Sequence, residues 1–161
     1  MWDAQSARQH GDILFEHLVE TWERLGRKDM SPLAFGFMSG TNGDEDECVV
    51  LPQVSVFPKE HIPTVLRLFA AEFDARFVAL AACATSLDGL PPEEMAAWYA
   101  TGKPLAEHPQ AKDCLVFTLD GVGLSIFMRA WWDGQTLCRE VLDNHGATGR
   151  MTNLSGRLGE N

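Results

Sequence analysis

The chain has 161 residues, of which 45% are hydrophobic and 22% charged, proportions typical of one globular domain. Lys and Arg total 13 and Asp and Glu total 23, which gives a net charge of -10. An acidic surface repels phosphate backbones and anionic membranes. No apolar run reaches the ~20 residues that a membrane span requires. The composition therefore predicts neither a nucleic-acid partner nor a membrane association.

The cysteine pattern indicates a reduced protein. Cys48, Cys83, Cys114 and Cys138 form neither a C-x-x-C pair nor a compact disulfide framework. No secretory apolar segment follows Met1. We therefore expect a cytoplasmic protein whose cysteines act as small core residues.

Residues 5–26 are predicted to form an amphipathic helix, because apolar side chains recur at helical spacing and charged side chains occupy the opposite face. The apolar positions are Leu14, Phe15, Leu18, Trp22 and Leu25. Residues 33–38 and 48–57 have strand character, and the loop between them ends in the acids Asp44 to Glu47. We expect a hairpin, with Pro52 placing the second strand at a sheet edge or bending it.

A second helix is predicted over residues 60–74, starting near His61 so that Pro63 falls in the first turn. Its buried face would consist of Ile62, Val65, Leu66, Phe69 and Phe73. Residues 76–85 are apolar on both faces, which suits a central strand covered on both sides, although their alanines also allow a helix. Residues 87–112 contain many glycines and prolines. They are expected to form a surface excursion with a short helix near 93–99, long enough to hold a functional site.

The C-terminal third contains Asp120-Gly121 and Asp133-Gly134, which are typical of two-residue type I′ turns. The first turn would pair Leu119 with Val122, Phe117 with Leu124 and Leu115 with Ile126, all on one face. The second turn would complete a three-stranded antiparallel meander. Residues 144–161 are rich in Gly, Asn, Ser and Thr and are expected to form an irregular tail.

Together these elements predict an α+β fold in one domain, residues 1–143, followed by the tail. The mainly antiparallel sheet would contain the N-terminal hairpin, the alanine-rich central strand and the C-terminal meander. Two helices would cover it.

The acidic loop and one histidine supply the candidate metal ligands, which are Asp44, Asp46 and His108. Carboxylate oxygens suit hard cations, but residues 42–47 lack the alternating acids and the glutamate spacing of a calcium loop. A solvated loop tip is the competing and simpler interpretation.

The group most like a catalytic site is Glu107, His108 and Asp113. A histidine beside carboxylates can act as a general base, or bind a metal while a carboxylate orients it. No second histidine lies at ligand spacing, and the sequence has no H-E-x-x-H, G-x-S-x-G or P-loop motif. A structural role for His108 therefore competes with a chemical one, and no cofactor is predicted.

Four aromatic residues, Trp98, Tyr99, Trp131 and Trp132, indicate a possible interface, where Trp and Tyr are enriched. Adjacent residues of a strand point to opposite faces. One of Trp131 and Trp132 can therefore belong to the core, while the other is exposed, covered by another element, or in contact with a partner.

The run Pro104 to Val116, with Glu107-His108-Pro109 ahead of Lys112-Asp113, follows the alanine-rich segment and precedes the first hairpin, and Gly156-Arg157-Leu158 lies near the C-terminus. This order resembles a loose group of small bacterial and phage-associated proteins with no established activity. The resemblance implies an α+β fold and no particular function. The chain departs from the group at Asp113, where a glutamate is common.

Three functional hypotheses follow. The leading one is a non-enzymatic protein-binding or self-associating domain with a protein partner or a second copy of the chain. The second is a small enzyme or metal-dependent site around Glu107, His108 and Asp113. The third is a small-molecule pocket between helix 60–74 and the central strand, lined by alanines too small to fill the space. It requires a sizeable apolar cavity there.

Overall fold

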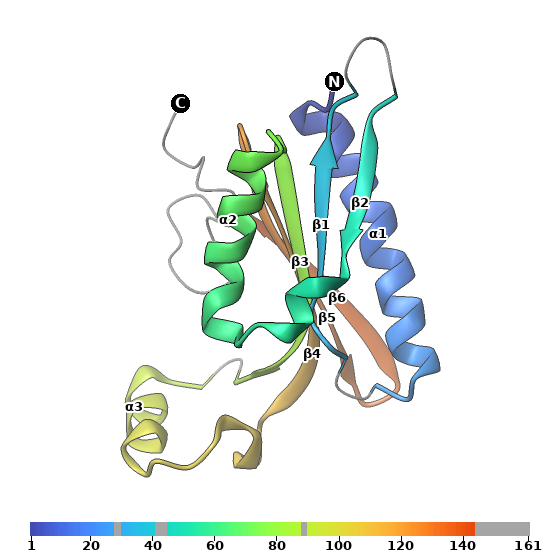
Figure 1. Ribbon diagram of the computed structural model, residues 1–161. Coiled ribbons are helices and arrows are strands. Elements are labelled where there is room, and N and C mark those ends of the chain that lie inside the picture. Colours follow the sequence, from blue (N-terminus) through green and yellow to red (C-terminus); the bar gives the residue numbers. More distant parts are fainter. Residues whose placement is uncertain (28–29, 41–44, 88–89, 144–161) are drawn as a thin grey trace.

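The computed structural model of the chain describes residues 1–27, 30–40, 45–87 and 90–143 (Figure 1). Its centre is a six-stranded sheet with the order β2-β1-β3-β4-β5-β6, in which every neighbouring pair is antiparallel. The strands are β1 Leu33–Met38, β2 Glu47–Leu51, β3 Phe77–Ser86, β4 Lys112–Gly121, β5 Leu124–Asp133 and β6 Thr136–Asp143. The α+β class, the N-terminal hairpin, the central alanine-rich strand and the C-terminal meander are confirmed. The predicted tail, residues 144–161, lies outside the described residues.

The long helix α1, Ala4–Arg24, covers one face of the sheet (Figure 1). A capping box starts it, since the side chain of Asp3 accepts from the Ser6 backbone N–H and Ser6 Oγ accepts from that of Asp3. The Ser6 backbone N–H also lowers the pKa of Asp3. The helix buries Phe15, Leu18, Val19 and Trp22 against phenylalanines and aliphatic residues of β1, β3, β4 and β5.

The shorter helix α2, Ile62–Glu72, covers the opposite face with Ile62, Leu66 and Ala70 (Figure 1). Its first turn contains Pro63, as predicted, with His61 at the N-cap. The prediction that Phe73 belongs to the buried face was wrong, because Phe73 is the C-cap residue and is 55% exposed. The two covering helices thus make separate cores on the two sides of the sheet.

The second strand is shorter than predicted. β2 ends at Leu51, and residues Pro52–Val56 form a short 3-10 turn, η1. Proline cannot donate to a strand ladder, so it ends the edge strand here. A second such turn, η2 (Lys59–His61), leads into α2. The expected edge position of this strand is confirmed.

Both predicted hairpin turns were placed too early. Gly121 pairs with Leu124 and Asp133 with Thr136, so the loops are Val122-Gly123 and Gly134-Gln135. Only the glycine of each loop has a positive φ, so neither turn is type I′. Leu119 therefore lies opposite Ile126 instead of Val122. Each residue of β4 pairs with a residue of β5 that lies an even number of positions from the predicted partner. The apolar residues therefore stay on the predicted face.

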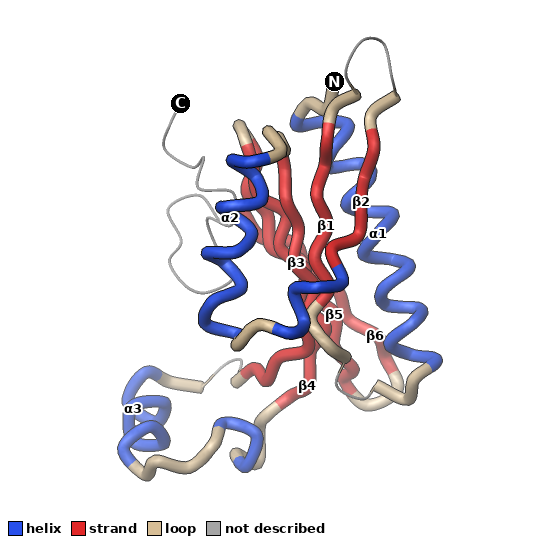
Figure 2. The backbone as a smooth tube through the Cα atoms, viewed as in Figure 1, coloured by secondary structure: helices blue, strands red, loops and turns tan. Residues whose placement is uncertain are grey.

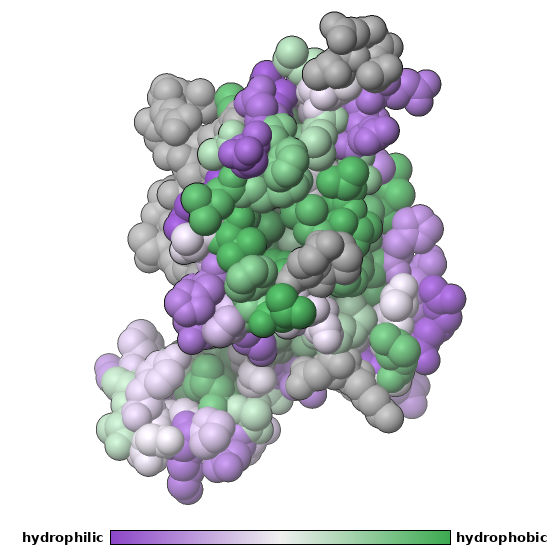
Figure 3. Space-filling view, viewed as in Figure 1, coloured by the Kyte–Doolittle hydropathy of each residue, from purple (hydrophilic) through white to green (hydrophobic). Residues whose placement is uncertain are grey.

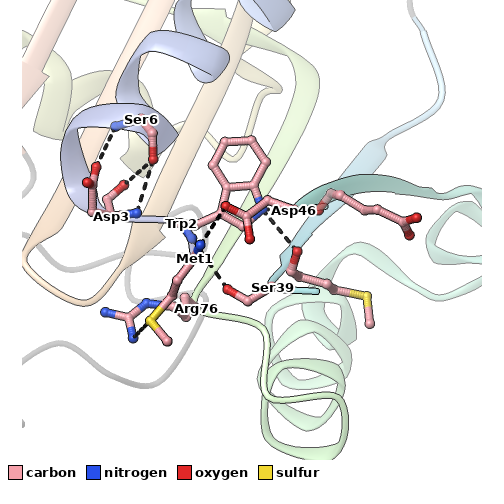
Figure 4. A network of polar contacts seen from close by, with 9 residues as sticks. Met1, Trp2, Asp3, Ser6, Ser39, Asp46 and Arg76 are labelled. Atoms are coloured by element: carbon pink, nitrogen blue, oxygen red, sulfur yellow. Dashed lines mark hydrogen bonds and ion pairs between the residues drawn. The ribbon is translucent and has the colours of Figure 1, made fainter. Parts of the chain in front are cut away.

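The indole of Trp2 ties the start of α1 to the β1–β2 hairpin (Figure 4). Its Nε1 donates to the main-chain oxygens of Met38 (3.1 Å) and Glu47 (3.2 Å). Its ring meets Phe37 edge-on, with 5.0 Å between the ring centroids. This contact fixes the direction in which α1 enters the structure.

Candidate functional site

A cavity of about 480 Å3 lies on the α2 side of the sheet, at the C-terminal end of β3. Its volume falls in the ordinary range for small-molecule sites, about 300–1,000 Å3. It is lined by Pro32, Lys59, Ile62, Pro63, Leu80, Ala82, Cys83, Ala84, Thr85, Pro104, Leu105, Ala106 and Val116. The cavity required by the pocket hypothesis is therefore present between the first turn of α2 and the central strand.

The cavity follows from the different lengths of the strands. The last pair between β1 and β3 joins Leu33 and Ala81, whereas β3 continues beside β4 as far as Ser86. On the α2 side, Ala82 and Ala84 follow the core residue Leu80 along β3. A methyl group is too short to reach the beginning of α2, so the space between them stays open.

The remaining wall comes from the excursion between β3 and β4, which extends away from the sheet (Figure 2). It contains α3, Pro92–Ala100, and the 3-10 turn η3, Leu105–Glu107. Pro104, Leu105 and Ala106 line the cavity opposite Ile62 and Pro63. Proline fixes its own backbone, so these walls are largely preformed.

Among the described residues that border the cavity, few are polar, namely Lys59, Cys83 and Thr85, and the Cys83 side chain packs against the α1 core on the other face of the sheet. The Cys83 sulfur accepts a hydrogen bond from the backbone N–H of Met30 at 3.3 Å. A site with an apolar lining and few polar groups is suited to binding and has no evident nucleophile–base pair.

The structure does not bring Glu107, His108 and Asp113 together. His108 Nδ1 accepts a hydrogen bond from the backbone N–H of Gln110 at 3.0 Å. Its ring packs edge-on against Trp98, with 4.7 Å between the ring centroids. Neither carboxylate forms a hydrogen bond or ion pair with His108, all three residues being described. His108 thus pins its own loop to α3.

Trp98 and Tyr99 lie on α3, away from the sheet. Trp98 is half-buried beneath His108, and Lys103 Nζ lies 5.8 Å from its ring centroid. Tyr99 is 61% exposed. Of the two, only Tyr99 offers a large free surface to a partner.

Trp131 and Trp132 point to opposite faces of β5, as predicted. Trp132 packs against the α1 core, its Nε1 donates to Glu23, and the Arg27 guanidinium stacks 3.8 Å from its ring centroid. Trp131 lies on the other face, where the Arg129 guanidinium is 4.7 Å from its ring centroid. Both rings therefore have intramolecular cover.

Sequence reasoning missed the polar group that holds Trp131 in place. Arg129 donates to Glu140 on β6 (2.6 Å) and to the hydroxyl of Ser86 at the end of β3 (3.1 Å). The pairing of Arg129 with Glu140 depends on the true register of β5 and β6. No local pattern in the sequence reveals it.

The metal candidates do not converge in the described part of the chain. Asp46 pairs with the terminal amino group of Met1 at 3.0 Å, and Asp44 lies outside the described residues. Across residues 1–27, 30–40, 45–87 and 90–143, no three His, Cys, Asp or Glu side chains gather as a metal site would require. Burial raises the pKa of the Cys48 thiol to about 11, so this half-buried cysteine is protonated at neutral pH.

Searches of protein-family models, curated proteins and solved structures found no match to the chain. Among the described helices, none combines the length and the apolar character needed to cross a membrane. The function of the chain is therefore inferred from the geometry of the site.

Proposed function

We propose that this chain is a non-enzymatic binding domain whose cavity beside α2 takes a small, mainly apolar ligand. The observation that carries the proposal is the cavity itself, about 480 Å3, with preformed walls from α2, β3 and η3. The group of Glu107, His108 and Asp113 supports the proposal indirectly. His108 is hydrogen-bonded within its own loop and does not line the cavity. The described residues that line the cavity also offer no evident nucleophile–base pair.

The proposal predicts that a neutral apolar dye, N-phenyl-1-naphthylamine, binds with a rise in fluorescence. Ala82→Phe should weaken this binding at least ~10-fold, because a ring placed in the cavity excludes the dye. The matched control is Ala97→Phe, which adds the same ring to an exposed position of α3. Thermal unfolding should show that both variants fold. Equal dye binding by wild type and Ala82→Phe would refute the proposal.

A second candidate function, self-association, is favoured by apolar side chains left exposed on the edge strand β2, on η1 and on α2. Val50 on β2 is 54% exposed, Val56 after it 78%, and Leu68 on α2 66%. Figure 3, viewed as Figure 1, shows hydrophobic surface gathered over the side of the molecule on which α2 and β2 lie. An edge strand with exposed apolar neighbours can pair with a second copy.

Self-association predicts a sedimentation coefficient that rises with protein concentration. Val56→Glu should shift the equilibrium toward monomer, because it places a charge in the contact. Ala97→Glu adds the same charge on α3 and should leave the equilibrium unchanged. A wild-type protein that stays monomeric across the whole concentration range would exclude this function.

The proposed location is a reducing compartment such as the cytoplasm. None of the four cysteines, all of which the structure describes, forms a disulfide, as is usual in such a compartment.

A further inference from the structure

The described lining of the cavity carries charge of one sign. Among the described residues that line the cavity, Lys59 is the only charged one, and none is an Asp or Glu. This is unexpected in a chain with 23 acidic residues and a net charge of -10. The cavity thus combines an apolar interior with a positive group on η2, just before α2.

Lys59 has no carboxylate partner in the part of the chain that the structure describes. Several arginines of the protein do have one, for example Arg27 with Glu23 and Arg129 with Glu140. A lysine on a flexible stem acts as a mobile point charge that needs no fixed geometry to meet an anion. The ammonium of Lys59 is therefore available to a ligand in the cavity.

We propose that the ligand is an apolar monocarboxylate, with its hydrocarbon part in the cavity and its carboxylate at the Lys59 ammonium. This inference rests on the proposed binding function and specifies the ligand class. A single ammonium balances one negative charge. The strongly acidic molecule disfavours ligands with several negative charges, such as phosphate esters. Each methylene group of a hydrocarbon chain that is buried in the cavity adds to the affinity.

The test is a calorimetric titration of the full chain with octanoate and with octanol, which share a hydrocarbon chain and differ in charge. We expect octanoate to bind more tightly. Lys59→Gln should weaken octanoate about fivefold, the size of a solvent-accessible ion pair, and leave octanol unchanged. Lys103→Gln removes the same charge from a residue that does not line the cavity and should change neither ligand. Added salt should weaken octanoate alone.

The outcomes distinguish the carboxylate anchor at Lys59 from the apolar pocket itself. Loss of affinity for both ligands in Ala82→Phe, with loss for octanoate alone in Lys59→Gln, supports the inference. Equal affinity of the wild type for the two ligands, or an equal effect of Lys103→Gln, overturns the carboxylate anchor and leaves the apolar pocket standing. Failure of both ligands and of the neutral dye to bind the wild type overturns the proposed function as well.

Discussion

Phe117→Ala is expected to lower the free energy of unfolding by about 3–5 kcal/mol, the usual cost of removing a buried aromatic ring. Phe117 lies at the centre of β4 and is 0% exposed. Its ring centroid is 6.1 Å from that of Phe15 on α1 and 6.4 Å from that of Phe35 on β1. The ring thus joins the long helix to both halves of the sheet, and its removal leaves a cavity that these neighbours cannot fill.

Urea unfolding measures the effect, with an unchanged slope showing that the unfolded state is the same. Phe73→Ala is the matched control, because it removes the same ring from a side chain that is 55% exposed. We expect the control to cost less than about 1 kcal/mol. Similar losses in the two variants would show that the α1 face of the sheet is not the dominant core. Since domains have about 5–15 kcal/mol of stability, Phe117→Ala should remove roughly a fifth of it or more.

The elements that the sequence predicts well are those with a strong local period. The helical spacing of Phe15, Leu18 and Trp22 marks α1, and the alternation of Leu115, Phe117 and Leu119 marks β4. In both cases neighbouring residues carry the information, and burial on one face follows directly from the period. The face of each element was therefore predictable even where its boundary was not.

Features that depend on distant pairing could not be predicted. Asp120 has the character of a turn residue, yet it lies within β4, buried between Val78 of β3 and Ser125 of β5. Pairing with β3 continues β4 through Asp120 and Gly121, the two residues that were expected to form the turn. Trp2 is a similar case, because its partners Met38 and Glu47 are more than 35 residues away.

The candidate site likewise has a part that the sequence predicts and a part that depends on distant contacts. The small side chains of β3 indicate a hollow next to helix 60–74, and the cavity is there. Lys59 and the wall formed by Leu105 could not be foreseen. The place of Lys59 depends on how η2 leads into α2, and that of Leu105 on how the excursion packs beside β3. The group around His108 resembled a catalytic site because its residues lie close together in the sequence. In space, the ring of His108 turns toward Trp98 instead of the two carboxylates.

The position of the first hairpin turn predicts a large difference between two glycines. A Cβ on Gly121 would lie 2.3 Å from the Arg76 main-chain oxygen and 2.3 Å from the Phe77 ring. Backbone cannot move aside cheaply, so Gly121→Asn should cost about 3 kcal/mol or more. Gly123 instead has a left-handed backbone, with φ of 73°, and open space around its Cβ position. Asparagine tolerates that conformation, so Gly123→Asn should cost less than about 1 kcal/mol.

Urea unfolding of the two variants decides between the two possible turns. If the chain turned at Asp120-Gly121, Gly121 would need the left-handed backbone, and Gly121→Asn would be the milder change. Because β4 continues through Gly121 to pair with Phe77 and Leu124, the opposite order is expected. The same comparison tests the register of β4 and β5, since moving this turn pairs every residue of β4 with a different residue of β5.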